Sequence, residues 1–556
     1  MKNLFEDFKE SLLSYLFKEK SLTEKEIEAI KNMTIEEKID KNILLPNVSV
    51  VDSNDGTYVL NVPNNYSKLR IGDRIKLFSN TKKYKATILD IYQDSFTVEC
   101  NGELDIESVF SIEIDSPNLI QSLIACLEDI SAGKPGASFL RILSGEKPLE
   151  IEDFLALNPH KIDGFGNVFN KLNEEQQNAV ESMLRFPTIH VLQGPPGTGK
   201  TQVLAATAIA TAIKNREVVV IANTHHAVNN ALMKIRSFSK ESIIIKVGDL
   251  LKNEDLDDSI IKFAKFSEYN DWSYSTRRAK RSGHIIGMTI WGAITYLGLH
   301  RHSHYRPYIA LVDEASLMGL SYASILGKCA SSICLFGDSR QMQPIYRPEL
   351  ESDNHSISIL DYCCKTVNNL PISILHTTYR MNEEITSAVS KSFYEPYGIK
   401  LISSNFSCNK KLDVANEKSS IRKIIVENEN CQEYNKEEAR LVSEEIKKLL
   451  EAGVSSREIA VITPFRKQVN EIRNAVHELF EIDYILIDTV ERLQGQDVDV
   501  IILSFATSSL DYMTDIKSFL FNHNRLNVML SRAKKQVIII ASPIVMQQLD
   551  YIIVND

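Results

Sequence analysis

The stretch GPPGTGKT, residues 194–201, has the residue types and the spacing of a loop that binds phosphate groups. It follows a short apolar run, Thr188–Leu192, that is expected to be a strand, and it precedes a helical pattern. Glycines let the backbone turn tightly, so that successive N–H groups and the positive end of the next helix face the phosphates. Lys200 would then reach the β- and γ-phosphates, and Thr201 would give its hydroxyl to Mg²⁺. The other loop residues expected to contact a nucleotide are Gly194, Pro195, Pro196, Gly197, Thr198 and Gly199.

A second candidate is the acidic pair Asp313 and Glu314, which comes directly after the apolar run Ile309–Val312 in IALVDEAS. Asp313 is expected to hold Mg²⁺, directly or through water, while Glu314 orients and activates the attacking water. An isolated Asp-Glu pair would be only a solvated strand end. Together with the phosphate loop it predicts nucleotide hydrolysis, and the glutamate favours hydrolysis over transfer to a bound small molecule.

A third candidate is the pair of arginines in RLNVMLSRAKK, residues 525–535. On a helix, Arg525, Val528, Met529 and Arg532 would share one apolar face, because positions three, four and seven apart lie together. A guanidinium keeps its charge there and is costly to leave unpaired. The residues alone leave two interpretations open: a structural salt bridge, or a polyanion on the far side of a cleft.

Short apolar runs alternate with helical patterns in two regions of the chain, and both phosphate-site candidates follow such runs. The further runs are Val218–Ala222 and Ile333–Phe336 in the first region, and Ile459–Ile462, Tyr484–Ile487, Val500–Ser504 and Val537–Ala541 in the second. Strands that alternate with helices form parallel sheets covered on both faces. The pattern therefore predicts an α/β fold with two domains.

The region before residue 117 has a different pattern. Phe5, Phe8, Leu12 and Leu16 form a helical stripe, and a capping box at Thr23 and Glu26 predicts the start of a second helix. From about residue 48 to 115, apolar residues alternate with polar ones in short runs separated by turns. Such short strands predict a small barrel, which could contact nucleic acid or serve only as a module.

Composition limits the classes of protein to consider. The chain has 556 residues and a net charge of −10, so it is too long for one core and is not a wholly basic nucleic-acid binder. Its eight cysteines form no C-x-x-C pair, which predicts reduced thiols and a cytoplasmic setting. The start is a poor signal peptide, and no apolar run is long enough to span a bilayer, so no membrane partner is expected.

The motifs occur in the order found in superfamily 1 helicases. The chain resembles the 5′-to-3′ branch of that family, which includes the RNA helicase of nonsense-mediated decay and its DNA-acting relatives. The matching stretches include LNEEQQNAV (172–180), ANTHHAVNNAL (222–232), DEAS (313–316), FGDSRQMQP (336–344), TTYRM (377–381), VITPFRKQ (461–468), TVERLQGQDVDVIILS (489–504) and RLNVMLSRAKK (525–535).

The resemblance implies roles around the nucleotide. Gln176 would read the adenine edge and Tyr379 would stack on adenine. Gln341 would sense the γ-phosphate, Arg380 would meet it, and Gly495 and Asp497 would face the nucleotide. Arg532 would act as an arginine finger across a closed cleft, an interaction worth about 10³–10⁵ in rate, whereas Arg525 would be structural.

The resemblance also implies contacts with a nucleic-acid strand. The residues expected there are Thr224, Arg277, Arg278, Thr463, Pro464, Thr489 and Gln494. The basic stretch WSYSTRRAKRSGH (272–284), which contains two of them, could equally be a solvated charge run, as could HRHSHYRPY (300–308). The alternate histidines of the second stretch lack the carboxylate or cysteine partners that a metal site needs.

The expected fold is therefore two tandem RecA-like P-loop domains with parallel sheets, an inserted small β-barrel and a short helical insertion. The expected domains are an N-terminal helical segment (1–47), the barrel (48–116), a first RecA-like domain (117–350) with the insertion at about 236–284, and a second (351–556).

The expected function is ATP- and Mg²⁺-dependent translocation or unwinding on single-stranded DNA or RNA, in the 5′-to-3′ direction. Two alternatives share the same motifs: an ATP-driven switch that remodels nucleoprotein without unwinding, and a regulatory ATPase subunit of a nuclease or other effector complex. The sequence does not decide between RNA and DNA or give the oligomeric state.

Overall fold

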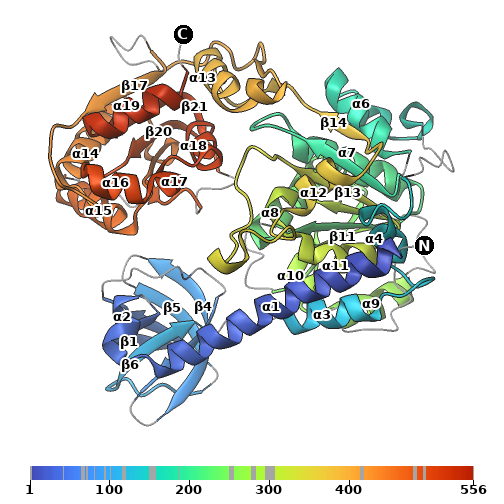
Figure 1. The fold of residues 1–556 in the computed structure, drawn as a ribbon, viewed down its shortest axis with the longest axis horizontal. Coiled ribbons are helices and arrows are strands. Elements are labelled where there is room, and N and C mark those ends of the chain that lie inside the picture. Colours follow the sequence, from blue (N-terminus) through green and yellow to red (C-terminus); the bar gives the residue numbers. More distant parts are fainter. Residues whose placement is uncertain are drawn as a thin grey trace.

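The computed structural model describes residues 3–554 except residues 42, 55, 64–68, 70–72, 80–81, 93–94, 101, 115–119, 150–157, 186, 250–255, 277–282, 295–306, 413–418, 480–484 and 492–495. A barrel, a long N-terminal helix and two α/β domains make up the described part (Figure 1). Within it, no helix combines the length and the apolar character that crossing a membrane would require.

The N-terminal segment is one long helix, α1 (Leu4–Asn32), followed by the short α2 (Ile35–Asp40). The predicted helix start at Thr23 is wrong, because this residue lies inside α1 and its Oγ1 donates to the Glu19 carbonyl at 2.8 Å. The capping box that does begin a helix is formed by Thr34 and Glu37 at α2. The first part of α1 packs on α3 (Ile120–Asp129) and α4 (Ala137–Leu143).

Six antiparallel strands close into a barrel at the far end of α1 (Figure 1). They are β1 (Leu44–Asn54), β2 (Thr57–Asn61), β3 (Arg74–Phe78), β4 (Lys83–Tyr92), β5 (Ser95–Cys100) and β6 (Val109–Ile114), in the order β1-β2-β5-β4-β3-β6. Alternate residues such as Leu60, Ile75 and Phe96 are fully buried in its core. The two-residue periodicity of the sequence arises from this alternation.

The first α/β domain has an eight-stranded sheet in the order β10-β9-β11-β8-β12-β13-β7-β14. The strands are β7 (Ile189–Gln193), β8 (Val218–Ala222), β9 (Ile243–Val247), β10 (Ile261–Phe263), β11 (His284–Thr289), β12 (Ile309–Val312), β13 (Ser332–Gly337) and β14 (Ile372–Ile374). Their register places the carboxyl ends of β7, β8, β12 and β13 at one edge.

Helices cover both faces of this sheet, which explains its almost continuous apolar strands. One face carries α5 (Gly166–Phe169), α6 (Glu174–Met183), α7 (Lys200–Ile213) and α8 (His225–Phe238). The other carries α1, α3 and α4 together with α9 (Phe266–Thr276), α10 (Ile290–Ala293), α11 (Ala323–Cys329) and α12 (Ile359–Thr366).

Two of the predicted boundaries in this domain need correction. The segment at about 236–284 is not a helical insertion in its described part, because β9 and β10 within it are strands of the main sheet, and only α9 and the last residues of α8 are helical. The domain also continues beyond residue 350, because β14 pairs in parallel with β7.

The second α/β domain contains the parallel sheet β17-β21-β20-β18-β19. Its strands are β17 (Ile421–Ile425), β18 (Ile459–Ile462), β19 (Leu486–Asp488), β20 (Val498–Ser504) and β21 (Ala533–Ala541). Its helices are α14 (Lys436–Glu451), α15 (Arg466–Leu479), α16 (Leu510–Asp515), α17 (Lys517–Leu520), α18 (His523–Leu530) and α19 (Pro543–Ile552). Along the chain, a linking segment between the last strand of the first sheet and the first strand of the second contains β15 (Thr377–Thr378), α13 (Glu383–Val389), a π-helical turn (Ser390–Tyr394) and β16 (Ile402–Ser403).

Candidate nucleotide site between the two domains

The phosphate loop connects the end of β7 to the start of α7, as the sequence predicts. Gly197 and Gly199 have φ values of +72° and +87°, which L side chains rarely adopt. A Cβ atom on Gly199 would also lie 2.4 Å from Nε2 of Gln176. The Lys200 ammonium folds over the loop and donates to the Gly194 carbonyl. The loop therefore combines a tightly curved backbone, a helix N-terminus and a lysine, which together suit a polyphosphate.

The acidic pair lies at the end of β12, beside the phosphate loop. Asp313 is only 6% exposed, and burial, followed by the neighbouring Glu314, raises the pKa of its carboxyl to about 7, although Lys200 opposes the shift. Glu314 has a φ of +52°, a left-handed conformation at the strand end. The ionised form of the buried Asp313 carboxylate would be stabilised by a nearby cation.

The described residues fit a magnesium nucleotide at this position. Mg²⁺ usually binds through one or two carboxylates together with substrate phosphates, rather than in a cage made only of protein. Asp313 and the Thr201 hydroxyl line the same cavity and would supply these ligands. Among the described residues, no group of three or more His, Cys, Asp or Glu side chains is placed to hold a metal ion.

A cavity of about 850 Å³ contains these groups and is lined from both α/β domains. The first domain contributes, among others, Gly197, Lys200, Thr201, Asp313, Glu314 and Gln341; the linking segment contributes Tyr379 and Arg380; the second domain contributes Asp497 and Arg532. The structure therefore brings the lysine, the acidic pair and both candidate arginines to one cavity.

Arg532 lies in the turn between α18 and β21 and not on a helix, because α18 ends at Leu530. It is 3% exposed, and its guanidinium donates to the Gln496 carbonyl at 3.4 Å and to Oε1 of Gln341 at 3.3 Å. Burial, followed by the like charge of Arg380, lowers its pKa to about 10. Arg532 forms no ion pair with any described residue, and its Nε has no hydrogen-bond partner there.

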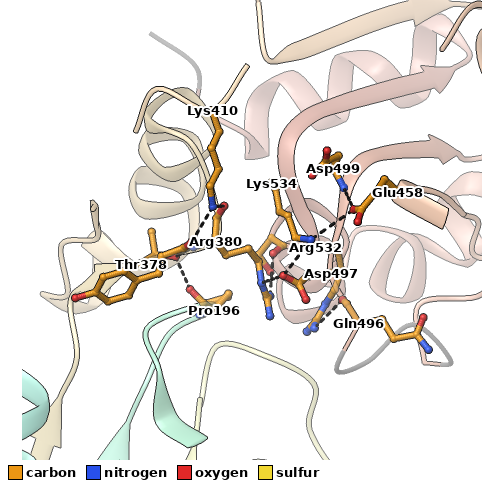
Figure 2. Close-up of polar contacts among 12 residues, drawn as sticks. Pro196, Thr378, Arg380, Lys410, Glu458, Gln496, Asp497, Asp499, Arg532 and Lys534 are labelled. Carbon is orange, nitrogen blue, oxygen red and sulfur yellow. Dashed lines mark hydrogen bonds and ion pairs between the residues drawn. The ribbon is translucent and has the colours of Figure 1, made fainter. Parts of the chain in front are cut away.

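Arg380 lies beside Arg532 and reaches the second domain (Figure 2). Its guanidinium donates to the Ser531 carbonyl at 3.1 Å, and its Nε lies 3.6 Å from the Asp497 carboxylate. Burial lowers the pKa of Arg380. Asp497 also lies 3.9 Å from Lys534, so one carboxylate is shared between two cations. By contrast, Arg525 pairs with Glu491 and stacks on Phe519, as expected of a structural arginine.

Tyr379 is fixed against the phosphate loop. Its backbone N–H donates to the Gly197 carbonyl at 2.9 Å, and its hydroxyl accepts from Nδ2 of Asn173 at 2.7 Å. Since Asn173 caps α6, the tyrosine ring is held between the linking segment and the first domain.

The expectation that Gln176 reads the adenine edge does not agree with its position. Gln176 is 2% exposed, and its amide accepts from the Asn173 N–H at 3.1 Å and donates to the Thr198 carbonyl at 3.0 Å. It is the third residue of α6, where a glutamine completes a capping box. The side chain therefore joins α6 to the phosphate loop.

Of the described residues expected to contact nucleic acid, the structure places only Thr224 at the cavity with an exposed side chain. Thr224 is exposed at the N-terminus of α8 and lines the cavity. Thr463, Pro464 and Thr489 are buried, with Thr463 fully so, and do not present their side chains to a strand as expected. Thr463 follows β18 and Thr489 follows β19, two paired strands of the second sheet. Arg277, Arg278, Gln494, Gly495 and the histidines at 300, 302 and 304 lie outside the described residues.

Several residues at the site were not singled out from the sequence. Asp338 follows β13 just as Asp313 follows β12, so the shared strand edge could have revealed it. Its carboxylate accepts from Nε2 of Gln193, the residue before the phosphate loop, at 2.6 Å. Tyr394 donates to Asp338 and accepts from Asn527, but no local pattern could reveal a contact between Tyr394 and Asn527, which lie 133 positions apart.

Comparisons with known proteins match both α/β domains of the chain. Residues 171–355 and 355–543 match two protein families, each described as an AAA domain. The chain is 25% identical over 393 residues to the DNA replication ATP-dependent helicase/nuclease JHS1 of Arabidopsis thaliana, covering 67% of this chain and 28% of that protein. It is also 25% identical over 446 residues to the DNA polymerase alpha-associated DNA helicase A of Schizosaccharomyces pombe, covering 68% of this chain and 65% of that protein.

The solved structures to which the chain is similar include the arterivirus nonstructural protein 10, a helicase. It has 12% sequence identity and a TM-score of 0.42, with 91% of this chain and 80% of that chain covered.

The two parallel sheets, the phosphate loop and the shared cavity define a P-loop ATPase with two RecA-like domains. Within that class, the chain belongs to the superfamily 1 helicases. It spans less than two thirds of the length of the Arabidopsis thaliana and Schizosaccharomyces pombe relatives.

Proposed function

We propose that the chain is an ATP-dependent translocase and helicase that moves 5′ to 3′ on single-stranded nucleic acid. The observation that carries this proposal is the single cavity to which one domain contributes Lys200 and Asp313 and the other contributes Arg532. The names of its relatives, a helicase/nuclease and a DNA helicase, support nucleic acid as the substrate.

The side chains divide the work of hydrolysis among them. Lys200 and the loop N–H groups hold the phosphates, and Glu314 orients the attacking water and accepts its proton. Asp313 and Thr201 would hold Mg²⁺, which would neutralise charge on the phosphate oxygens. Arg380 and Arg532 stabilise the charge that develops on the γ-phosphate. Because these arginines come from beyond the first domain, ATP favours the closed arrangement and hydrolysis releases it.

The cavity also continues toward the expected strand-binding edge. Asn223 and Thr224 before α8, and His226, Asn230 and Lys234 along it, line the same cavity as the nucleotide groups. Polar side chains at a helix N-terminus suit a phosphate backbone, which carries no sequence information. This continuity supports coupling between the nucleotide and a nucleic-acid strand.

ATP turnover tests the proposal directly. Wild-type protein should hydrolyse ATP faster when single-stranded DNA or RNA is added, and the preferred polymer identifies the substrate class. Lys200→Ala should lower turnover by about 10²–10³-fold or more, because the phosphates lose their cation. Turnover that no nucleic acid stimulates would contradict the translocase and favour a regulatory ATPase subunit of an effector complex.

Strand displacement tests unwinding and direction. A duplex with a 5′ single-stranded tail should be unwound in the presence of ATP, whereas a duplex with a 3′ tail should not. Stimulated turnover without displacement of either protein-free duplex would instead favour a nucleoprotein-remodelling switch.

All eight cysteines are free, which supports the related proposal of a reducing, cytoplasmic setting.

A further inference from the structure

Tyr394 occupies the junction of the two α/β domains. It ends the π-helical turn between the two sheets and is completely buried. Its hydroxyl donates to Oδ2 of Asp338 at 2.6 Å and accepts from Nδ2 of Asn527 at 2.8 Å. Asp338 belongs to the first domain and Asn527 to α18 of the second. One hydroxyl therefore connects both domains.

On the first-domain side, Asp338 organises the wall of the nucleotide cavity. Besides Tyr394, its carboxylate accepts from Gln193 at 2.6 Å, from the Arg340 N–H at 3.0 Å and from Nε2 of Gln341 at 2.8 Å. The first of these partners precedes the phosphate loop. The last has its amide oxygen turned toward Arg532. Asp338 thus fixes the rotamer of the residue that holds the arginine.

On the second-domain side, Asn527 fixes α18, the helix that leads into Arg532. Its Nδ2 donates both to Tyr394 and to the Arg340 carbonyl at 2.7 Å. Arg532 follows five residues later and returns to Gln341. The contacts close a ring that runs from Tyr394 through Asp338, Gln341 and Arg532 to α18 and back.

The chemistry of the hydroxyl suits this place. Burial, and next the Asp338 carboxylate, raise the pKa of Tyr394 well above its ordinary value. The hydroxyl therefore stays protonated at every physiological pH and keeps donating to Asp338. A buried carboxylate that loses one of its donors is destabilised, because no water replaces the lost bond.

We propose that Tyr394 is a positioning residue whose hydroxyl sets Gln341 and Arg532 for ATP hydrolysis by tying α18 to Asp338. The inference rests on the proposed hydrolysis of ATP in the shared cavity. It concerns the chemical step and not nucleotide binding, because neither Tyr394 nor Asn527 lines the cavity.

Tyr394→Phe tests the role, since it removes only the oxygen and keeps the ring in its packing. Tyr397→Phe is the matched control: its ring, which packs against Arg340, is kept, and its hydroxyl makes no hydrogen bond to a described residue. Nucleic-acid-stimulated kcat should fall about tenfold in Tyr394→Phe, with the KM for ATP unchanged, as expected for one buried hydrogen bond. Tyr397→Phe should behave as wild type.

A second variant separates positioning from general damage. If the hydroxyl acts through Asn527, the losses of Tyr394→Phe and Asn527→Ala in kcat should not multiply in the double variant. Wild-type kcat in Tyr394→Phe would overturn the inference and leave the proposed function intact. A rise in KM together with lower thermal stability would overturn it in favour of a structural role. Absence of ATP turnover in wild-type protein would overturn both proposals.

Discussion

The two cavity arginines explain why this site should bind an anion. Arg532 is buried and Arg380 largely so, and both have lowered pKa values. The charge of Arg380 contributes to the lowered pKa of Arg532, and Arg380 shares the Asp497 carboxylate with Lys534. Guanidinium groups stay charged at neutral pH even so. A polyphosphate between the two arginines and Lys200 would offset the repulsion between their positive charges. Binding of ATP would therefore stabilise the arrangement in which the two domains are close together.

The raised pKa of Asp313 predicts how the free protein responds to pH. The folded pKa of about 7 lies above the unfolded value, so protonation favours the folded state. That contribution is full below about pH 4 and is lost as the pH rises through about 7. Asp313→Asn should therefore raise the melting temperature of the nucleotide-free protein at pH 8 and change it little at pH 5. An equal shift at both values would show that this carboxyl does not carry the strain.

The chemistry of the site was more predictable than its geometry. The phosphate loop and the acidic pair could be found from spacing alone, because each follows an apolar strand. Arg532 was expected on a helix, but the apolar pattern continues across the junction from α18 into β21 and hides where the helix ends. The partners of Arg532 come from distant parts of the chain, and spacing holds no information about them.

At the scale of elements, α6 carries Gln176, which was predicted to contact the adenine but instead joins the helix to the phosphate loop. Gln176→Ala should lower the melting temperature, because loss of the capping box costs about 0.5–2 kcal/mol and the Thr198 carbonyl loses a donor. ATP and GTP affinities should fall by the same factor, since the loop moves for both. The exposed Asn178→Ala on the same helix is the control. A loss confined to ATP would restore the role of adenine reader.

Strand positions followed from the sequence where apolar runs were flanked by turns, as in β8, β12 and β18. The strands β9 and β10 were missed because the stretch around them was taken as a helical insertion, although Ile243, Ile244 and Ile245 are β-branched and favour a strand. Thr23 was predicted to begin a helix but lies inside α1. A threonine can bond back to the preceding turn and stay inside a helix.

At the scale of the whole molecule, the sequence predicted two α/β domains and a barrel, because each has its own periodicity. It misplaced the boundary between the two domains, since β14 joins the first sheet only after α12 has intervened. The interface itself, with Tyr394 and the cavity at its centre, is a property of the assembled chain. The residues on the two sides of this interface are far apart in the sequence, so no local pattern predicts their contact.

The central claim is that ATP is hydrolysed between a lysine of one domain and an arginine of the other. The most direct test is to measure the stimulated kcat and the ATP affinity of Arg532→Ala, with the exposed Arg440→Ala as the control. We predict that kcat falls by about 10³-fold or more while affinity changes by less than about threefold, and that the control matches wild type. Undiminished turnover in Arg532→Ala would contradict hydrolysis between the two domains.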